Sequence, residues 1–192
     1  MRVIAGSAGS IRFQAIPRGV RPTTARIREA IFSSLGDAVI GARVLDLFAG
    51  VGTLGIEALS RGAASAVLVE HAERCSKCIR HNLMRTRLSA VVQTVDVFRF
   101  INFHTECDSF DLVFADPPYA RSTMDGQDPA SRLCGSRSLI QAISPPGIFV
   151  LEAFRKFHLP KNCGWTPLKE KSLNGTAILF LTRSNDLEPI SL

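Results

Sequence analysis

Short apolar runs alternate along the chain with segments whose apolar residues recur at helical spacing. The runs cover residues 44–48, 66–69, 91–95, 111–115 and 148–151. Runs of this length are typical of strands buried on both faces of a parallel sheet. Two more runs, residues 165–171 and 176–182, flank Asn174-Gly175, a strong signal for a tight hairpin turn. The pattern predicts an α/β protein with a doubly wound parallel sheet followed by a β-hairpin.

The segments between the runs supply helices and one long loop. We expect residues 1–36 to form an N-terminal basic arm with a helix, and residues 37–192 to form a single globular domain. A helix is predicted over residues 72–86, and another ends near residue 143, where Pro145-Pro146-Gly147 breaks it. Residues 120–136 are polar and predict a loop in a position to close over a substrate.

The N-terminal arm, residues 1–21, is basic and contains no acidic residue. Residues 3–5 and 11–16 predict a small hairpin. Pro22-Thr23-Thr24 then opens a helix with a threonine cap, and Gly36 ends it. The apolar face of this helix carries Ile27, Ala30, Ile31 and Leu35, and Arg26 and Arg28 are expected off that face. A basic arm without acidic residues favours contacts with phosphate groups, and a solvent-exposed edge with no ligand is the alternative. The candidate RNA-contacting residues of the arm and the helix are Arg2, Arg12, Arg18, Arg21, Arg26 and Arg28.

Composition narrows the class of protein. The chain has 192 residues, a net charge of +6 and a pI near 9.4, which suits one domain with an acidic partner such as nucleic acid. The sequence contains no run of about 18 apolar residues, so no membrane span is predicted. No signal peptide is evident. Five cysteines, an odd number, favour a reducing cytoplasm.

Cys75 and Cys78 form a single C-x-x-C on a predicted helix, which favours two buried small residues over a zinc or redox site, and we expect no metal.

The most informative stretch is RVLDLFAGVGTLG, residues 43–55. Gly50, Gly52 and Gly55 follow a buried strand at G-x-G-x-x-G spacing, and a helix follows them, which predicts a nucleotide-type site. We expect Gly52 to let the ligand approach the backbone closely. Asp46 lies in the strand, where a carboxylate disfavours the pyrophosphate of a dinucleotide and suits the cationic S-adenosylmethionine. An NAD-type protein, and an Asp46 that merely caps the turn, stay open at this point.

Two more acidic residues end predicted strands. Glu70 lies 20 residues after Gly50, where an acid typically holds a ribose diol. Asp96 ends the third strand, where a carboxylate can accept from an adenine amino group. It can equally be the N-cap of the next helix, and the two roles are compatible.

The fourth strand leads into Asp116-Pro117-Pro118-Tyr119. Two prolines fix the backbone and remove two donors, which leaves their carbonyls for ligands. Asp116 supplies an acceptor, and Tyr119 an aromatic face on which a base can stack. This set suits an exocyclic amine on a nucleobase, although the same four residues also make an ordinary turn.

The two motifs together resemble the class I S-adenosylmethionine-dependent methyltransferases that modify amino nitrogens. The stretch RPTTARIREAIF, residues 21–32, resembles a narrower family, the bacterial 16S ribosomal RNA guanine-N2 methyltransferases. This resemblance covers most of the chain. It implies a Rossmann-like, mostly parallel sheet with an antiparallel C-terminal hairpin and a short N-terminal extension. It also implies a cofactor site at Asp46, Phe48, Gly50, Gly52, Glu70 and Asp96, and catalysis at Asp116, Pro117, Pro118 and Tyr119.

The resulting hypothesis is a direct methyl transfer from S-adenosylmethionine to the N2 amine of a guanine in 16S ribosomal RNA, catalysed mainly by positioning. The expected partner is this RNA within a small-subunit particle in the cytoplasm, with no membrane and no metal involved. An adenine-N6 methyltransferase remains an alternative, because D-P-P-Y fits it too. A non-enzymatic RNA-binding or assembly factor is the second alternative.

Overall fold

The computed structural model describes residues 1–14, 23–118 and 128–184. Its strands are β1 (Arg43–Leu47), β2 (Ser65–Val69), β3 (Val91–Gln93), β4 (Phe110–Ala115), β5 (Ile143–Phe154), β6 (Trp165–Leu173) and β7 (Thr176–Arg183). Its helices are α1 (Ala25–Leu35), the 3₁₀ turn η1 (Gly36–Val39), α2 (Thr53–Ser60), α3 (Glu73–Thr86), α4 (Val97–Phe103), α5 (Pro129–Cys134) and α6 (Arg137–Ala142).

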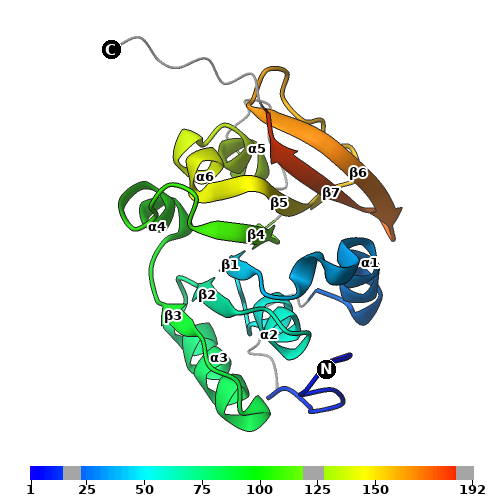
Figure 1. The fold of residues 1–192 in the computed structure, drawn as a ribbon, viewed down its shortest axis with the longest axis vertical. Coiled ribbons are helices and arrows are strands. Elements are labelled where there is room, and N and C mark those ends of the chain that lie inside the picture. Colours follow the sequence, from blue (N-terminus) through cyan, green and yellow to red (C-terminus); the bar gives the residue numbers. More distant parts are fainter. Residues whose placement is uncertain (15–22, 119–127, 185–192) are drawn as a thin grey trace.

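These strands form one sheet in the order β3-β2-β1-β4-β5-β7-β6. Strands β1 to β5 run parallel, and β7 lies antiparallel between β5 and β6. The chain builds β1, β2 and β3 outward and then returns to place β4 on the other side of β1 (Figure 1). The strand order therefore reverses between β1 and β4, which is where sheets of this kind bind ligands. The doubly wound sheet and its C-terminal hairpin are confirmed.

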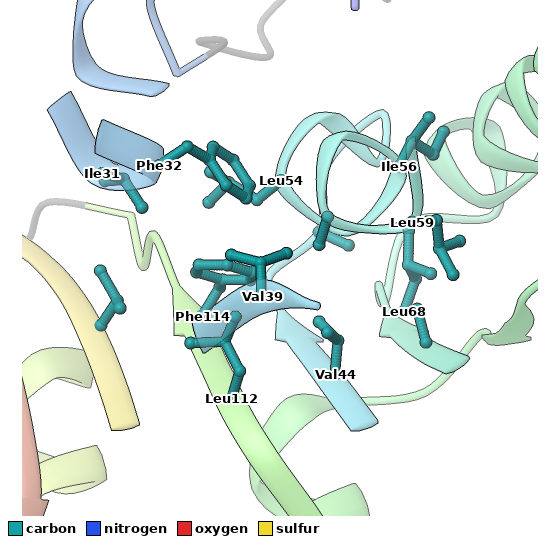
Figure 2. Close-up of a cluster of buried hydrophobic side chains, with 14 of the residues drawn as sticks. Ile31, Phe32, Val39, Val44, Leu54, Ile56, Leu59, Leu68, Leu112 and Phe114 are labelled. Atoms are coloured by element: carbon teal, nitrogen blue, oxygen red, sulfur yellow. The ribbon is translucent and has the colours of Figure 1, made fainter. Parts of the chain in front are cut away.

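Two hydrophobic clusters cover the two faces of the sheet. Side chains alternate along a strand, so Val44 belongs to one cluster and Leu45 to the other. The first cluster packs α1, α2, α3 and part of the arm against the sheet, and the second packs α4, α5 and α6. Figure 2 shows the first cluster, in which Phe32 of α1 faces Phe114 of β4 with the ring centroids 5.6 Å apart. Helix α1 is thereby held over the carboxyl half of β4.

The described part of the arm, residues 1–14, packs beside α2 and α3 (Figure 1). Arg2 and Arg12 face each other in an isolated antiparallel bridge, which confirms a hairpin-like pairing there. Val3 and Phe13, the next residues along, are buried in the first cluster. Residues 15 and 16 of the predicted hairpin lie outside the described residues. Because the arm and α1 share a core with the sheet, they are packed parts of the same globular unit.

Two elements differ from the sequence prediction because of local capping. The third strand covers three residues and not five, since Asp96 already serves as N-cap of α4 and accepts a hydrogen bond from the Arg99 N–H at 3.0 Å. Helix α5 lies inside the predicted loop 120–136. Asp128 caps it and Pro129 occupies its first turn, a combination that favours a helix start.

The fifth strand is also longer than predicted. It begins at Ile143, which pairs with Phe110, and the register shifts before Leu112 pairs with Ile148. The prolines therefore end helix α6 as expected, but they lie within the irregular start of the strand. Such a register shift at the start of a strand tolerates proline, because the missing N–H leaves no ladder bond unmade.

Candidate active site

The glycine loop turns sharply at the carboxyl end of β1. Phe48, Gly50 and Gly52 all have positive φ angles, of 57°, 58° and 83°. The Gly52 N–H donates to the Ala49 carbonyl at 2.7 Å, and α2 begins at the next residue. A bulky residue such as Phe48 is rarely found at positive φ, and strain of this kind is concentrated at ligand sites.

The side of Gly52 that a β-carbon would occupy faces the core. A β-carbon there would lie 3.0 Å from Leu68 Cδ2 and 3.1 Å from Ile56 Cδ1. A side chain at Gly52 would therefore point into the core and not into the space of a ligand, so close approach of a ligand is not the reason for a glycine here. This glycine is required by its φ angle and by packing under the loop.

Asp46 is buried beneath the glycine loop, with 2% of its surface exposed. Its Oδ2 accepts a hydrogen bond from the Gly55 N–H at 2.8 Å, so it does cap the turn. Burial raises the pKa of Asp46 to about 7, against the opposing effect of the Gly55 N–H, and the carboxylates of Asp116 and Glu70 raise it further. A buried acid poised near neutrality is stabilised in its charged form by a cation.

Glu70 joins the end of β2 to the same loop. Its Oε2 accepts from the Gly50 N–H at 2.9 Å, and its Oε1 accepts from the Ala72 N–H at 2.8 Å. The side chain is 6% exposed. Glu70 therefore braces the loop from the neighbouring strand, and its contact with a ribose stays a prediction.

An aromatic pair joins the glycine loop to α4. Phe48 lies edge-to-face with Phe98 of α4, with the ring centroids 6.2 Å apart. The guanidinium of Arg132 lies 3.5 Å from the centroid of the Phe98 ring. Asp96 is exposed two residues before Phe98 and caps α4. Sequence reasoning missed Phe98, although an aromatic residue soon after a strand-ending acid was an available signal.

Asp116 leaves the sheet next to the glycine loop. Ala115 pairs with Leu47 of β1, so Asp116 and Phe48 are the first residues beyond two adjacent parallel strands. Asp116 is half-buried and accepts a hydrogen bond on Oδ2 from the Thr23 hydroxyl at 2.7 Å. Pro117 is buried and Pro118 is exposed, while Tyr119 lies outside the described residues. The fold thus brings the two sequence motifs together at the switch point of the sheet.

The candidate arginines of the arm fall into three groups. Arg2, Arg12 and Arg26 are exposed, and Arg18 and Arg21 lie outside the described residues. Arg28 is 1% exposed, so its expected place off the buried face is wrong. Its guanidinium donates to the Arg2 carbonyl at 3.0 Å and faces Glu57 of α2, and it is therefore not available to a phosphate in this structure.

The cysteine pair has no sign of a special chemistry. Cys75 and Cys78 are buried free cysteines on α3, and burial raises the pKa of the Cys75 thiol, which makes it less reactive. Within the described ranges no group of three or more histidine, cysteine or acidic side chains is placed to hold a metal ion. Over the same ranges no helix combines the length and the apolar character of a membrane span.

Comparison with known proteins places this chain in a family. A Bacillus subtilis protein named "Putative rRNA methyltransferase YlbH" is 33% identical over 185 residues, covering 93% of this chain and 97% of that protein. Ribosomal RNA small subunit methyltransferase D of Haemophilus influenzae is 30% identical over 176 residues, covering 90% of this chain and 88% of that protein. The Escherichia coli structure named "Putative methyltransferase yhhF" superposes with a TM-score of 0.75 at 28% identity, covering 95% of this chain and 97% of that one. The model of the family described as "Conserved hypothetical protein 95" matches residues 1–182, and the chain belongs to this family.

Proposed function

We propose that this protein transfers a methyl group from S-adenosylmethionine to the exocyclic N2 amine of a guanine in 16S ribosomal RNA. The observation that carries the proposal is the pairing of Leu47 with Ala115, which brings the glycine loop and the D-P-P turn to one point of the sheet. A cofactor loop beside a nucleobase-amine motif is the arrangement that this reaction requires. The relatives named as ribosomal RNA methyltransferases match nearly the whole chain and support the same reading.

The residues around the loop fit S-adenosylmethionine better than a dinucleotide. Asp46, Glu70 and Asp116 gather three carboxylates at the carboxyl ends of neighbouring strands. Burial raises the pKa of Asp46, and the charges of Asp116 and Glu70 raise it further. A pyrophosphate would add negative charge to this cluster, whereas an ammonium and a sulfonium would offset it. Asp46 and the loop would hold the methionine part, and Glu70 would hold the ribose. Phe48, Phe98 and Asp96 would hold the adenine.

The chain's contribution to catalysis is orientation. When bound, S-adenosylmethionine supplies an electrophilic methyl group. Asp116 and the Pro117 carbonyl accept hydrogen bonds from the guanine amine, which aims its nitrogen lone pair and eases the loss of its proton. Tyr119 stacks on the base after it leaves its own stack in the RNA. Holding both reactants in line accounts for most of the acceleration in such a reaction.

The substrate is RNA, and the small-subunit particle is the form that we propose for it, in the cytoplasm. The exposed arginines Arg2 and Arg12 lie opposite each other on the arm and suit a phosphate backbone. An adenine-N6 activity is the alternative that shares the D-P-P-Y chemistry. The two are distinguished by which base carries the new methyl group.

The decisive experiment uses S-adenosylmethionine labelled on its methyl group and small subunits isolated from cells that lack the endogenous modification. We expect label in 16S RNA, mapped by mass spectrometry to a single N2-methylguanine. Matched samples of naked 16S RNA and of large subunits are the controls. Label on adenine would replace the proposal by the alternative, and absence of label from all three samples would contradict an RNA methyltransferase.

A further inference from the structure

Thr23 contacts the candidate catalytic carboxylate from a distant part of the chain. Its hydroxyl donates to Oδ2 of Asp116 at 2.7 Å across 93 residues of sequence. The Thr23 side chain is 7% exposed and Asp116 is half-buried, so this bond is partly shielded from bulk water. Hydrogen bonds to a charged acceptor are stronger than neutral ones, and shielding makes them stronger still.

The position of Thr23 is set by the packing of α1. The next residue, Thr24, caps this helix by accepting from the Ile27 N–H at 3.3 Å. Phe32 of the same helix packs on Phe114 of β4, which lies two residues before Asp116 in the chain. The donor and the acceptor are therefore fixed by one helix–strand contact. Because Thr24 already caps the helix, the hydroxyl of Thr23 is not needed for capping.

We propose that Thr23 is a positioning residue that holds the Asp116 carboxylate in the orientation that receives the guanine amine. This inference rests on the proposed function, because it assigns a partner to the proposed catalytic residue. A carboxylate on a single-bonded stem rotates freely unless a neighbour fixes it. An ionised carboxylate has about four acceptor positions, so the bond from Thr23 occupies one of them and does not by itself exclude the amine. The Thr23 hydroxyl thus acts on the substrate only through Asp116.

The test compares three substitutions at Thr23 with one control. Thr23→Val and Thr23→Ala remove the donor, and Thr23→Ser keeps it. The matched control is Thr86→Val, which removes another buried threonine hydroxyl, one that donates to the Asn82 and Leu83 carbonyls within α3. Turnover is measured on small subunits, binding of S-adenosylhomocysteine by calorimetry, and unfolding by heating.

We expect Thr23→Val and Thr23→Ala to lower kcat by about 10- to 100-fold, as loss of a bond to a charged group would. We expect the KM for S-adenosylmethionine and the affinity for S-adenosylhomocysteine to change by less than about 2-fold, because the cofactor site is not altered. Thr23→Ser should restore most of the turnover, and Thr86→Val should leave it unchanged.

Two results would overturn the inference. One is wild-type turnover in a folded Thr23→Val or Thr23→Ala protein. The other is a loss in Thr23→Ser as large as in Thr23→Ala, which would assign a packing role to the side chain. Failure of the proposed function looks different, because the wild-type protein itself would then place no label in guanine.

Discussion

The Nη1 atom of Arg28 lies 3.7 Å from the Oε2 atom of Glu57, and both side chains are almost fully buried. Glu57 also accepts from the N–H groups of Ile4 and Ala5, at 2.7 and 3.0 Å, and from Arg61 Nε at 2.8 Å. One buried carboxylate of α2 therefore holds α1 and the start of the arm. Arg28, which the sequence suggests for RNA contact, instead donates to the Arg2 carbonyl. It thereby fixes the backbone at Arg2, whose own side chain is exposed.

This network predicts an asymmetric effect on stability. Among the described residues, Arg28 Nε and Nη1 have no hydrogen-bond partner, so Arg28 depends on the charge of Glu57. Glu57→Gln should lower the free energy of unfolding by about 3 kcal/mol, because it leaves a buried cation uncompensated. Arg28→Met should cost less, since Glu57 keeps its other partners.

Urea unfolding measures these values, with the double variant as the control. We expect the variant carrying both Glu57→Gln and Arg28→Met to be more stable than Glu57→Gln alone, because the uncompensated cation is gone. Equal and additive costs for the two single variants would contradict this account of the pair.

The glycine loop predicts a packing defect at Gly52. Gly52→Ala should destabilise the fold by more than the cost of the positive φ angle alone, because its β-carbon meets Leu68 and Ile56. Gly41→Ala is a matched control, since Gly41 also has a positive φ, of 74°, and no atom lies within 4 Å of the added carbon. The control should cost about 1–2 kcal/mol, and Gly52→Ala clearly more, in thermal unfolding. An equal loss of stability in the two variants would indicate that the Gly52 β-carbon meets no neighbouring atoms.

The raised pKa of Asp46 predicts that cofactor binding releases a proton. Burial keeps Asp46 partly protonated below about pH 7 in the free protein, and a bound ammonium group favours the ionised form. The affinity for S-adenosylhomocysteine should therefore rise from about pH 5.5 to about pH 7.5 and level off above that. Calorimetry in two buffers with different ionisation enthalpies measures the released proton. Asp46→Asn should bind more weakly and release none, and a similar release in that variant would assign the proton to another group.

Asp116 is predicted to act on the amine and not on the cofactor. Asp116→Ala should lower methyl transfer by about 10²- to 10⁴-fold while S-adenosylhomocysteine binding stays nearly intact. Asp111→Ala is the control on the same strand. Asp111 lies at the other end of β4, where Arg43 holds the pKa of its carboxyl well below the ordinary value. That variant should lose stability but keep turnover, and near-normal turnover in Asp116→Ala would remove Asp116 from the mechanism.

The arm is predicted to contact phosphate through Arg2 and Arg12. The two exposed side chains lie opposite each other, and their mutual repulsion favours an anion between them. Replacing both by alanine should weaken RNA binding and flatten the dependence of log affinity on log salt by about one to two units.

Replacing Lys161 and Lys169 is the matched control, because both are exposed and lie in or next to β6, at the other end of the sheet. This double variant removes the same charge and should leave the slope nearly unchanged. An equal change of the salt slope in both double variants would indicate a general effect of net charge. An unchanged slope in both would mean that the arm is a solvent-exposed edge that does not contact phosphate.

The sequence by itself determined the elements and the two motifs. The run before Gly50 predicts β1, and the alternation of strands and helices predicts a doubly wound sheet, which the strand order confirms. Asn174-Gly175 predicts the final hairpin, and β6 and β7 pair on either side of it. These signals act within a few residues, because periodicity, glycine φ angles and proline restrictions are local properties of the backbone.

Only the tertiary structure decided which residues meet. Arg28 sits between Arg26 and Glu29 in a basic segment, and nothing local distinguishes it from an exposed arginine until Glu57 approaches it. What a β-carbon at Gly52 would meet depends on Leu68 in the next strand, and a partner of Asp116 is a threonine 93 residues away. Such contacts leave no local pattern, because they arise when strands and helices far apart in sequence pack against each other. The energy of a buried charge or hydrogen bond is likewise set by that packing and not by its neighbours in the chain.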